Sequence, residues 1–505
     1  MSGISLNCLR CFVYVLMLLR CSQCIRILAI APFPTKSNWS FMTAVLHSLT
    51  DQDHIVTVFT PFLNGNYANY TEIDISGNRQ WTQVDMDLSK RVKDIGNLQN
   101  LAINSMKLNT QICDEFYAND KLREIIIAAS SLRNTEQFDV ILAQTLSSDC
   151  LSCIARILNL PLINVHAAPS LAFESPFVGE EPNPAYVTTV LSPLGTPKSF
   201  QERVLNSAIA FQSKFYFWFA EAMAKKLSPK PYDLIEPVNP SAMFINSHLA
   251  IEPARPNVPN VINIGGIHLS GPKAIPKDVL DFIENSPNGV IYLSFGSTIA
   301  MSKLPERIQK SFKLALGQLP QRILWKFESE MEDKPDNVMT KKWFPQRDIL
   351  VHPNVVLFIG HGGIAGIYEA IDAGVPMLGF PMVLDQPRNL ANLGAAGMAI
   401  SLQLMSVTET QILNSVHELI NNEMYSRNAK TVSELFKDRP MSPQKSVVYW
   451  TEYVARHNHK KSPYLKSEAF DLTWYEILLL DIFLACLITL IFVTYLFCKC
   501  LTLRR

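Results

Sequence analysis

The residues best suited to chemistry lie between Phe358 and Asn392. In this stretch an apolar run is followed by Gly360-His361-Gly362-Gly363, at the start of a helical pattern. Glycines let backbone N–H groups approach a ligand closely, and the start of a helix carries about half a positive charge. The loop therefore suits a phosphate group, and His361 could add a hydrogen-bond donor. Ser297 would add a hydroxyl at the end of another strand of the same domain.

Side chains that suit a nucleoside and a sugar surround this loop. Glu369 follows two turns along the helix, where its carboxylate could accept both hydroxyls of a ribose. Asp385 and Gln386 follow the next strand and offer the carboxylate and the amide that sugar hydroxyls require. Upstream, Trp343 and Gln346 offer an indole face and an amide to a planar base. Together these residues predict a site for a nucleotide sugar.

The elements that must position these residues form two α/β series. Short apolar runs alternate with helical patterns, which is typical of parallel sheets. In the first series we expect strands at 25–30, 54–59, 138–143 and 160–165, and helices at 40–49, 89–131, 150–158 and 195–227. In the second series we expect strands at 289–295, 322–326, 355–359, 375–380 and 398–402, and helices after a capping box at Ser406 and Glu409 and at 443–456.

Prolines between the two series predict the domain boundary. We expect an N-terminal Rossmann-like domain at 25–250, a linker at 251–275 and a C-terminal Rossmann-like domain at 276–475. Two doubly wound domains would face each other across a cleft. Ligands in such folds bind beyond the carboxyl ends of the strands.

Both ends of the chain predict targeting to a membrane. Residues 1–24 resemble a signal peptide, with Arg10 before a short apolar run. Residues 476–498 are long and apolar enough for a transmembrane helix, and the basic residues of the tail at 499–505 place that tail in the cytosol. The domains would then be lumenal, where Asn69 in Asn-Tyr-Thr is the better of two glycosylation candidates.

Composition excludes one class of partner. Lys plus Arg and Asp plus Glu both total 45, so the chain lacks the basic excess of a nucleic-acid-binding protein. Three cysteines, Cys113, Cys150 and Cys153, lie outside the two terminal segments, and we expect no disulfide scaffold among them. Cys150 and Cys153 have the spacing of redox and metal sites, although small helical residues explain that spacing more simply.

The motifs of the second half together resemble the UDP-glycosyltransferase family, in particular its insect members. The resemblance rests on Trp343-x-Pro-Gln346, His361-Gly-Gly363, Gly366-Ile-Tyr-Glu369-Ala370, Gly374-x-Pro376, Asp385-Gln386-x-x-Asn389, Phe295-Gly-Ser297, Asp438-Arg-Pro440 and Phe200-x-Glu-Arg203. It implies a GT-B fold, a UDP-sugar donor, a small lipophilic acceptor, no metal or other cofactor, and the endoplasmic reticulum membrane in single-pass type I topology. A homo-oligomer is possible. The insect members favour UDP-glucose as the donor, with UDP-glucuronic acid as the alternative.

The resemblance also assigns roles in the donor site. Trp343 would stack on uracil, Gln346 would bond its edge, and Glu369 would hold the ribose. The phosphates would contact Ser297 and His361 with Gly362 and Gly363, and the sugar would contact Asp385 and Gln386. Arg255 matches an arginine that the family places near the diphosphate, although a solvated linker arginine explains it equally well.

The acceptor half departs from the family. A histidine at the start of the first helix of the family's N-terminal domain acts as base, and a carboxylate after the fourth strand orients it. Here these positions hold Asn38 and Gln144. Asp149 could replace the carboxylate, although capping of a helix explains it at least as well. A catalytically impaired binder of UDP-sugars or lipophiles is therefore the alternative to an active glycosyltransferase.

Two other motifs have alternative interpretations. Gly360-x-Gly362-x-x-Ala365 with Asp385 further on fits a dinucleotide fingerprint, but Pro381-Met-Val-Leu separates that aspartate from its strand. Asp85-Met-Asp87 has the form of a metal-dependent glycosyltransferase motif, but no strand precedes it. We therefore expect neither a nicotinamide enzyme nor a metal site.

Overall fold

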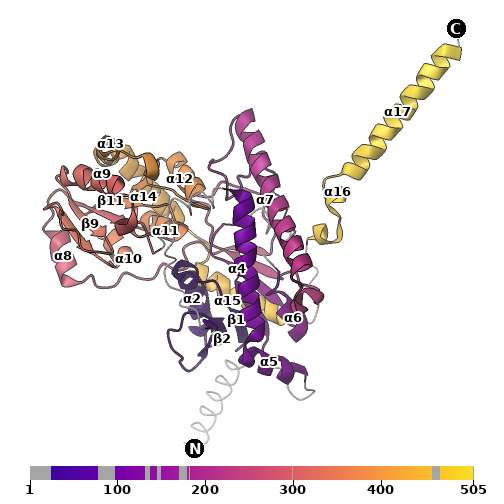
Figure 1. Cartoon of the computed structure of the whole chain (residues 1–505), viewed down its shortest axis with the longest axis horizontal. Helices are drawn as coiled ribbons and strands as arrows, with labels where there is room; N and C mark the ends of the chain where they lie inside the picture. Colours follow the sequence, from indigo (N-terminus) through magenta and orange to yellow (C-terminus); the bar gives the residue numbers. More distant parts are fainter. Residues whose placement is uncertain are drawn as a thin grey trace, which may run out of the picture.

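The computed structural model describes residues 24–77, 97–130, 137–144, 149–169, 179–180, 182–297, 299–457 and 467–503. These residues form two α/β lobes and a long C-terminal helix that projects away from them (Figure 1). The signal-peptide prediction, apart from Cys24, and the Asp85-Met-Asp87 pair lie outside this part of the chain.

The N-terminal lobe contains a parallel sheet with seven strands in the described residues. Its order is β3 (Tyr70–Asp74), β2 (Ile55–Thr60), β1 (Arg26–Ile30), β4 (Val140–Gln144), β5 (Leu162–His166), β6 (Ala242–Ile245) and β7 (Val261–Asn263). Helices α2 (Lys36–Thr50), α4 (Leu98–Ala118), α5 (Asp120–Ser130), α6 (Cys153–Leu158) and α7 (Phe200–Leu227) accompany it.

The C-terminal lobe repeats this plan with a parallel sheet of six described strands. Its order is β10 (Val338–Lys341), β9 (Arg322–Lys326), β8 (Val290–Ser294), β11 (Val355–Gly360), β12 (Met377–Gly379) and β13 (Ala399–Ser401). Helices α8 (Lys277–Glu284), α9 (Glu306–Gly317), α10 (Gln346–Leu350), α11 (Ile364–Ala373), α12 (Gln386–Ala395), α13 (Glu409–Asn421) and α14 (Glu423–Lys437) belong to this part of the chain.

Both faces of each sheet are covered, because successive side chains of a strand point to opposite faces. In β1, Ile27 and Ala29 join one hydrophobic cluster while Leu28 and Ile30 join the cluster on the other face. This double burial explains why the central strands are continuous apolar runs that could be predicted from the sequence.

The boundary between the lobes differs from the prediction in two ways. Strand β7 lies inside the segment at 251–275 that we expected to be a linker, and it pairs with β6 in the N-terminal sheet. Helix α15 (Pro443–His457), expected in the C-terminal domain, packs on α2, with Val447 and Val454 in the N-terminal core (Figure 1). The capping box of α13 is formed by Thr408 and Gln411, not by Ser406 and Glu409, since Ser406 ends a short 3-10 turn.

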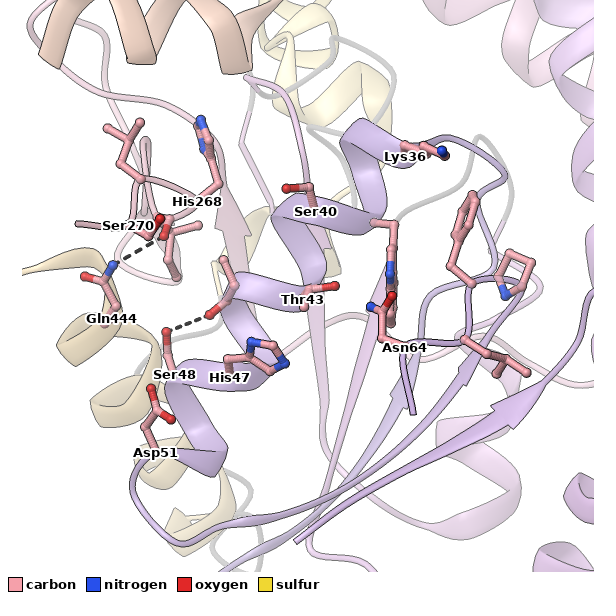
Figure 2. A pocket seen from close by; sticks show the side chains of 17 residues that line it. Lys36, Ser40, Thr43, His47, Ser48, Asp51, Asn64, His268, Ser270 and Gln444 are labelled. Atoms are coloured by element: carbon pink, nitrogen blue, oxygen red, sulfur yellow. Dashed lines mark hydrogen bonds between the residues drawn. The ribbon is translucent and has the colours of Figure 1, made fainter. Parts of the chain in front are cut away.

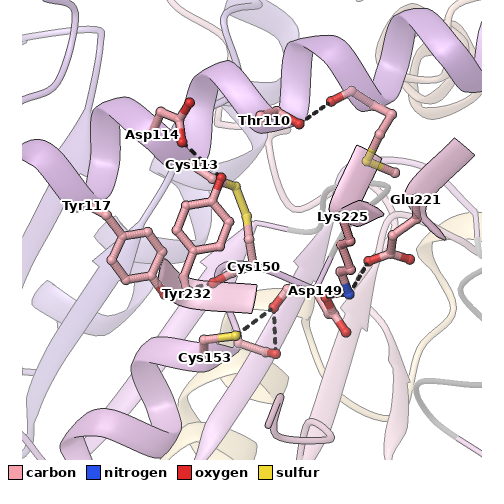
Figure 3. The surroundings of a disulfide bond; sticks show 12 residues. Thr110, Cys113, Asp114, Tyr117, Asp149, Cys150, Cys153, Glu221, Lys225 and Tyr232 are labelled. Atoms are coloured by element: carbon pink, nitrogen blue, oxygen red, sulfur yellow. Dashed lines mark hydrogen bonds and ion pairs between the residues drawn. A yellow bond between two sulfur atoms is a disulfide. The ribbon is translucent and has the colours of Figure 1, made fainter. Parts of the chain in front are cut away.

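A disulfide contradicts our expectation for the cysteines. Cys113 of α4 pairs with Cys150, 37 residues away in the sequence, because α4 passes beside the start of α6 (Figure 3). Cys153 remains a thiol whose pKa is raised to about 11 by burial. The Cys-x-x-Cys pair is therefore neither a redox motif nor a metal site: one member is a structural half-cystine and the other is a buried thiol.

The C-terminal helix matches the predicted anchor in length and composition. Helix α17 spans Leu480–Leu503, and Leu480–Thr502 is apolar enough to cross a membrane. None of its apolar window is buried against the rest of the protein. A helix of this kind inside a soluble core would be mostly buried, so α17 is a candidate membrane span.

Candidate active site

The predicted donor residues meet because three strands of the C-terminal sheet end at the same level. Gly360 at the end of β11 lies opposite Ser294 of β8 and Gly379 of β12. The loops that follow these strands therefore emerge side by side at the carboxyl edge of the sheet. They carry Ser297, His361 and Asp385.

The loop at 360–363, which is predicted to bind phosphate, packs tightly around His361. A Cβ atom on Gly296 would lie 2.8 Å from the imidazole, and one on Gly363 would lie 2.5 Å from its Nε2 atom. Glycine is therefore required at both positions. Gly363 caps α11, so the free backbone N–H groups of the first helical turn lie directly after the imidazole. This arrangement can bind an anion without any cation in contact with it.

Burial keeps His361 neutral. Removal from water, and to a smaller extent the charge of Lys326, lower the pKa of His361 to about 4. Its Nδ1 atom is buried and has no hydrogen-bond partner in the described part of the chain. A neutral imidazole with one uncommitted nitrogen can contact a phosphate through a single hydrogen bond.

Glu369 and Gln346 form a pair on the other side of α11. The Gln346 amide donates a hydrogen bond to the Glu369 carboxylate, and Gln346 also lies against Gly366. Burial raises the pKa of Glu369 to about 7, while the bond from Gln346 opposes the increase. The exposed Trp343 ring precedes Gln346, with the ammonium of Lys326 5.9 Å from its centre. An exposed indole beside an amide and a carboxylate can receive a base and its ribose.

Asp385 and Gln386 have different tasks at the start of α12. The amide of Asn389 donates to Asp385 at 2.6 Å and to the carbonyl of Gly362 at 3.1 Å, which connects the aspartate predicted to bind sugar with the loop predicted to bind phosphate. The side-chain oxygen of Gln386 accepts from the backbone of Met382 and Val383. Gln386 therefore uses its oxygen to shape the loop. Burial raises the pKa of Asp385, and the bond from Asn389 opposes the increase.

A buried ion pair joins α12 to the β6–β7 connection of the N-terminal lobe. Arg388 donates to both oxygens of Glu252, at 2.9 and 2.6 Å, and the two side chains are 2% and 7% exposed. Arg255, three residues after Glu252, has a buried Nη2 atom with no partner among the residues that the structure describes. The contact between Arg255 and the diphosphate therefore stays a prediction. The Nη2 atom could donate the hydrogen bond that this contact requires.

Asn38 and Gln144, predicted on the acceptor side, lie near the carboxyl ends of β1 and β4, but both side chains are hydrogen-bonded to residues of the loop at 33–35. Asn38 donates to the hydroxyl of Thr35 at 2.7 Å, and Gln144 accepts from the backbone of Phe33 at 3.2 Å. Because β1 and β4 are neighbours, both side chains flank the same loop. Within the described ranges neither bonds the other, so they stabilise the loop and do not form a dyad.

Asp149 is engaged elsewhere. Its carboxylate lies 3.3 Å from the Lys225 ammonium, and Lys225 also pairs with Glu221 of α7 (Figure 3). Burial, and to a smaller extent the neighbouring Asp149 charge, raise the pKa of Glu221 to about 7. Asp149 thus fastens α7 to the start of α6, which is a structural task.

A cavity of about 800 Å³ lies between α2, the loop after β2 and the segment 267–270 (Figure 2). Lys36, Ser40, Thr43 and His47 line it from one stripe of the helix, at spacings of three and four residues. Asn38 points away from this stripe, because each residue turns a helix by about 100°. Asn38 therefore does not line this cavity.

Sequence reasoning gave no role to three residues beside the donor site, Lys326, Arg388 and Asn389, although Asn389 stands in a motif that carries the family resemblance. Lys326 is buried at the end of β9, next to the loop that carries Ser297. The sequence did contain a signal for Lys326, because this lysine ends an apolar run that was predicted to be a strand of the donor domain. Arg388 had no signal, because its partner Glu252 is 136 residues away in the sequence.

Solved structures define the class of protein. The fold resembles that of Phytolacca americana UGT2 complexed with UDP-2fluoro-glucose and pterostilbene, with a TM-score of 0.58 and 16% identity over 86% of this chain and all of that one. It also resembles the glycosyltransferase VinC in complex with DTDP, with a TM-score of 0.55 and 16% identity over 86% of this chain and all of that one. The two lobes therefore form a GT-B fold.

The sequence defines the family within this class. Residues 27–504 match the family described as UDP-glucoronosyl and UDP-glucosyl transferase. The chain is 34% identical to UDP-glucosyltransferase 2 of Dactylopius coccus over 92% of this chain and 90% of the relative. It is 31% identical to human UDP-glucuronosyltransferase 2B15 over 92% of each. The protein belongs to this family and is a glycosyltransferase that takes its sugar from a UDP-sugar, which excludes the nicotinamide alternative.

Proposed function

We propose that this protein transfers a hexose, most favourably glucose, from its UDP-sugar to a small lipophilic acceptor, with inversion and without a metal. One observation carries the proposal: phosphate, ribose and sugar side chains from separate loops meet around the first turn of α11. The relative from Dactylopius coccus bears the name of a glucosyltransferase, which supports glucose. UDP-glucuronic acid is the alternative donor.

Each donor residue has a role that its surroundings permit. Trp343 stacks on uracil, and the Gln346–Glu369 pair bonds the base edge and the ribose hydroxyls. The α11 N-terminus and His361 stabilise the negative charge that grows on the diphosphate as the glycosidic bond breaks. Asp385, fixed by Asn389, accepts from sugar hydroxyls. Preorganised donors aimed at a leaving group are effective because the protein does not have to rearrange during the reaction.

The acceptor half supplies orientation without a strong base. An asparagine amide cannot take a proton, and Asn38 already donates to Thr35. The reaction then relies on proximity and on departure of UDP, which can contribute several kcal/mol without a base. Acidic phenols, which ionise near neutral pH, and uncharged amines need the least help. We therefore expect phenols and amines to react better than aliphatic alcohols.

A catalytically impaired binder is the second candidate. The hydrogen bonds that tie Asn38 and Gln144 to the loop at 33–35 favour it, because they leave no dyad. Such a protein would retain the donor site and bind UDP-sugars without transferring them.

A donor and acceptor screen on microsomes that contain the full chain tests the proposal. UDP release is measured with UDP-glucose or UDP-glucuronic acid and with a phenol, an amine or an aliphatic alcohol, in the presence of EDTA to test metal independence. We expect release with UDP-glucose and a phenol, and a loss on the order of 10²–10³ in the His361→Ala variant. Binding of UDP without turnover on any acceptor would favour the second candidate.

A further inference from the structure

Helix α7 presents an apolar stripe to solvent along its whole length. Its 28 residues extend about 42 Å, and the stripe repeats at helical spacing. The exposed members are Phe200, Val204, Phe211, Phe215, Trp218 and Phe219. Phe211 and Trp218 are 72% and 65% exposed, and the rings of Phe211, Phe215 and Phe219 stack in series. So large an apolar stripe on a protein surface marks a contact with something else.

The opposite face of α7 already has its partner. Phe217 and Ala220 pack against Ala102 and Met106 of α4, and α7 also lies beside α4 in Figure 1. The stripe is therefore a second apolar face, which the fold leaves uncovered in the described residues. The capping box at Ser199 and Glu202 fixes the start of the helix, so the stripe is presented on a rigid element.

The charges of α7 suit a lipid surface. Arg203 and Lys214 lie three turns apart beside the stripe, whereas Lys225, three turns further on, is paired with Asp149 and Glu221. Glu202 lies on the opposite side of the helix. Aromatic residues on one face with basic residues at its border are typical of helices that lie in the interface of a bilayer. Long basic side chains can extend their charges toward headgroups.

We propose that the stripe on α7 rests in the surface of the bilayer that α17 spans, so that the N-terminal lobe is bound to the membrane at two places. This inference rests on the prediction that α17 is a transmembrane helix that anchors the protein. The chain from His457 to Trp474 can extend at most about 60 Å, which keeps the lobes close to that bilayer. In Figure 1, α7 lies on the side of the N-terminal lobe from which α16 (Trp474–Ile477) and α17 extend.

Photo-crosslinking to lipid tests the contact in the full chain. The protein is reconstituted in nanodiscs that contain a phospholipid with a diazirine in its acyl chain, and adducts are mapped by mass spectrometry. We expect adducts on α7 and on α17. The Phe211→Glu/Trp218→Glu variant should lose adducts on α7 at least tenfold and keep those on α17. The matched control Leu314→Glu/Leu435→Glu, which changes exposed apolar residues of the C-terminal lobe, should keep both.

The outcomes separate the contact from the anchor. Adducts on α17 with none on α7 would overturn the inference and leave the anchor intact. Adducts on α7 with none on α17 would support the surface contact and contradict the anchor. Adducts on neither would contradict both. Protein crosslinks between the α7 helices of two copies, in place of lipid adducts, would overturn the inference in favour of self-association.

Discussion

Burial removes charge from two titratable residues of the donor site, in opposite directions. The pKa of His361 falls to about 4, so the imidazole is neutral at physiological pH. The pKa of Glu369 rises to about 7, so this carboxyl is close to half protonated there. Both shifts have the same cause, which is that an apolar site disfavours the charged form. The donor site therefore contains one group that titrates near neutral pH and one that does not.

Glu369 should make nucleoside binding depend on pH. A carboxylate can accept hydrogen bonds from both ribose hydroxyls, whereas the protonated form must use one oxygen as a donor. The ionised fraction rises as pH passes upward through the pKa of about 7. We expect the Kd of uridine to fall about tenfold between pH 6 and pH 8, since only the ionised fraction binds well. NMR titration measures this Kd, and uridine avoids the titration of the UDP phosphates.

The Glu369→Gln variant is the control for this pH dependence. An amide does not titrate in this range, so binding should be weaker and independent of pH. His361 should contribute nothing to the profile, because its pKa of about 4 lies below the range. A uridine Kd that is constant between pH 6 and 8 in the unmodified protein would show that Glu369 does not bind ribose as a carboxylate.

Restoring a base at Asn38 distinguishes an enzyme from a binder. A positioned histidine contributes roughly 10²–10⁴ to the rate when its pKa lies near the working pH. Asn38→His alone, and with Gln144→Asp, should increase turnover of an aliphatic alcohol more than that of a phenol, because the alcohol needs the base most. The measurement is UDP release on both acceptors. No gain on either acceptor, with UDP still bound, would favour the non-catalytic alternative.

Residue types at strand ends could be predicted from the sequence, but their partners could not. The sequence places His361, Glu369 and Asp385 after apolar runs, and the structure brings their loops together at one sheet edge. By contrast, the hydrogen bond from Asn38 to Thr35 depends on side-chain geometry within one turn of helix. The spacing of residues in the sequence does not predict that geometry. The same limit applies to Asp149, whose partner Lys225 lies 76 residues away in the sequence.

At the scale of elements, the ion pair between Glu252 and Arg388 fixes the start of α12 against the β6–β7 connection of the N-terminal lobe. Removing one partner of a buried pair leaves an uncompensated charge and costs about 3–5 kcal/mol. We expect Glu252→Gln to lower the free energy of unfolding by an amount in this range. Denaturant titration of the purified protein measures the loss.

A double variant separates stability from positioning. Glu252→Leu/Arg388→Met replaces the pair with apolar groups of similar size, which is often neutral for stability. The start of α12 would no longer be held by two directional hydrogen bonds, so Asp385 would lose its fixed position. We therefore expect unfolding close to the unmodified protein and a KM for UDP-glucose at least fivefold higher. An unchanged KM would reduce the pair to a structural role.

Most central strands and the long helices could be predicted because burial on two faces leaves continuous apolar runs. Strands β3, β6, β7 and β10 could not be predicted. β6 has only four residues, the other three lie at sheet edges, and β7 follows prolines that indicate a linker. Helix α15 has an ordinary amphipathic pattern, and its return to the N-terminal lobe depends on contacts with α2 that are distant in sequence. Local sequence patterns predict that a helix or strand forms, but they do not predict which sheet it packs against or joins.

At the scale of the whole molecule, the two lobes are joined by more than one chain segment. The chain passes from β7 into the C-terminal lobe and returns through α15, and Arg439 of the returning segment donates to the carbonyl of Gly265. Tyr368 of α11 approaches the backbone of Asn246 at the same interface. The helix that carries the phosphate site therefore contacts the N-terminal lobe, which is what a reaction between a donor on one lobe and an acceptor on the other requires.

The topology of the chain is the last prediction. Acidic Glu468, Asp471 and Glu476 precede α17, whereas Lys499, Arg504 and Arg505 follow its apolar run. Basic residues remain on the cytosolic side of a membrane span, so the tail should be cytosolic and both lobes lumenal. In sealed microsomes, protease added from outside should remove only residues 499–505. The chain would lose less than 1 kDa at roughly 110 Da per residue, and a tag on residue 505 would disappear. Detergent is the control: once the membrane is opened, both lobes become accessible. Digestion of the lobes before detergent is added would reverse the assigned orientation, and with it the lumenal site of the reaction.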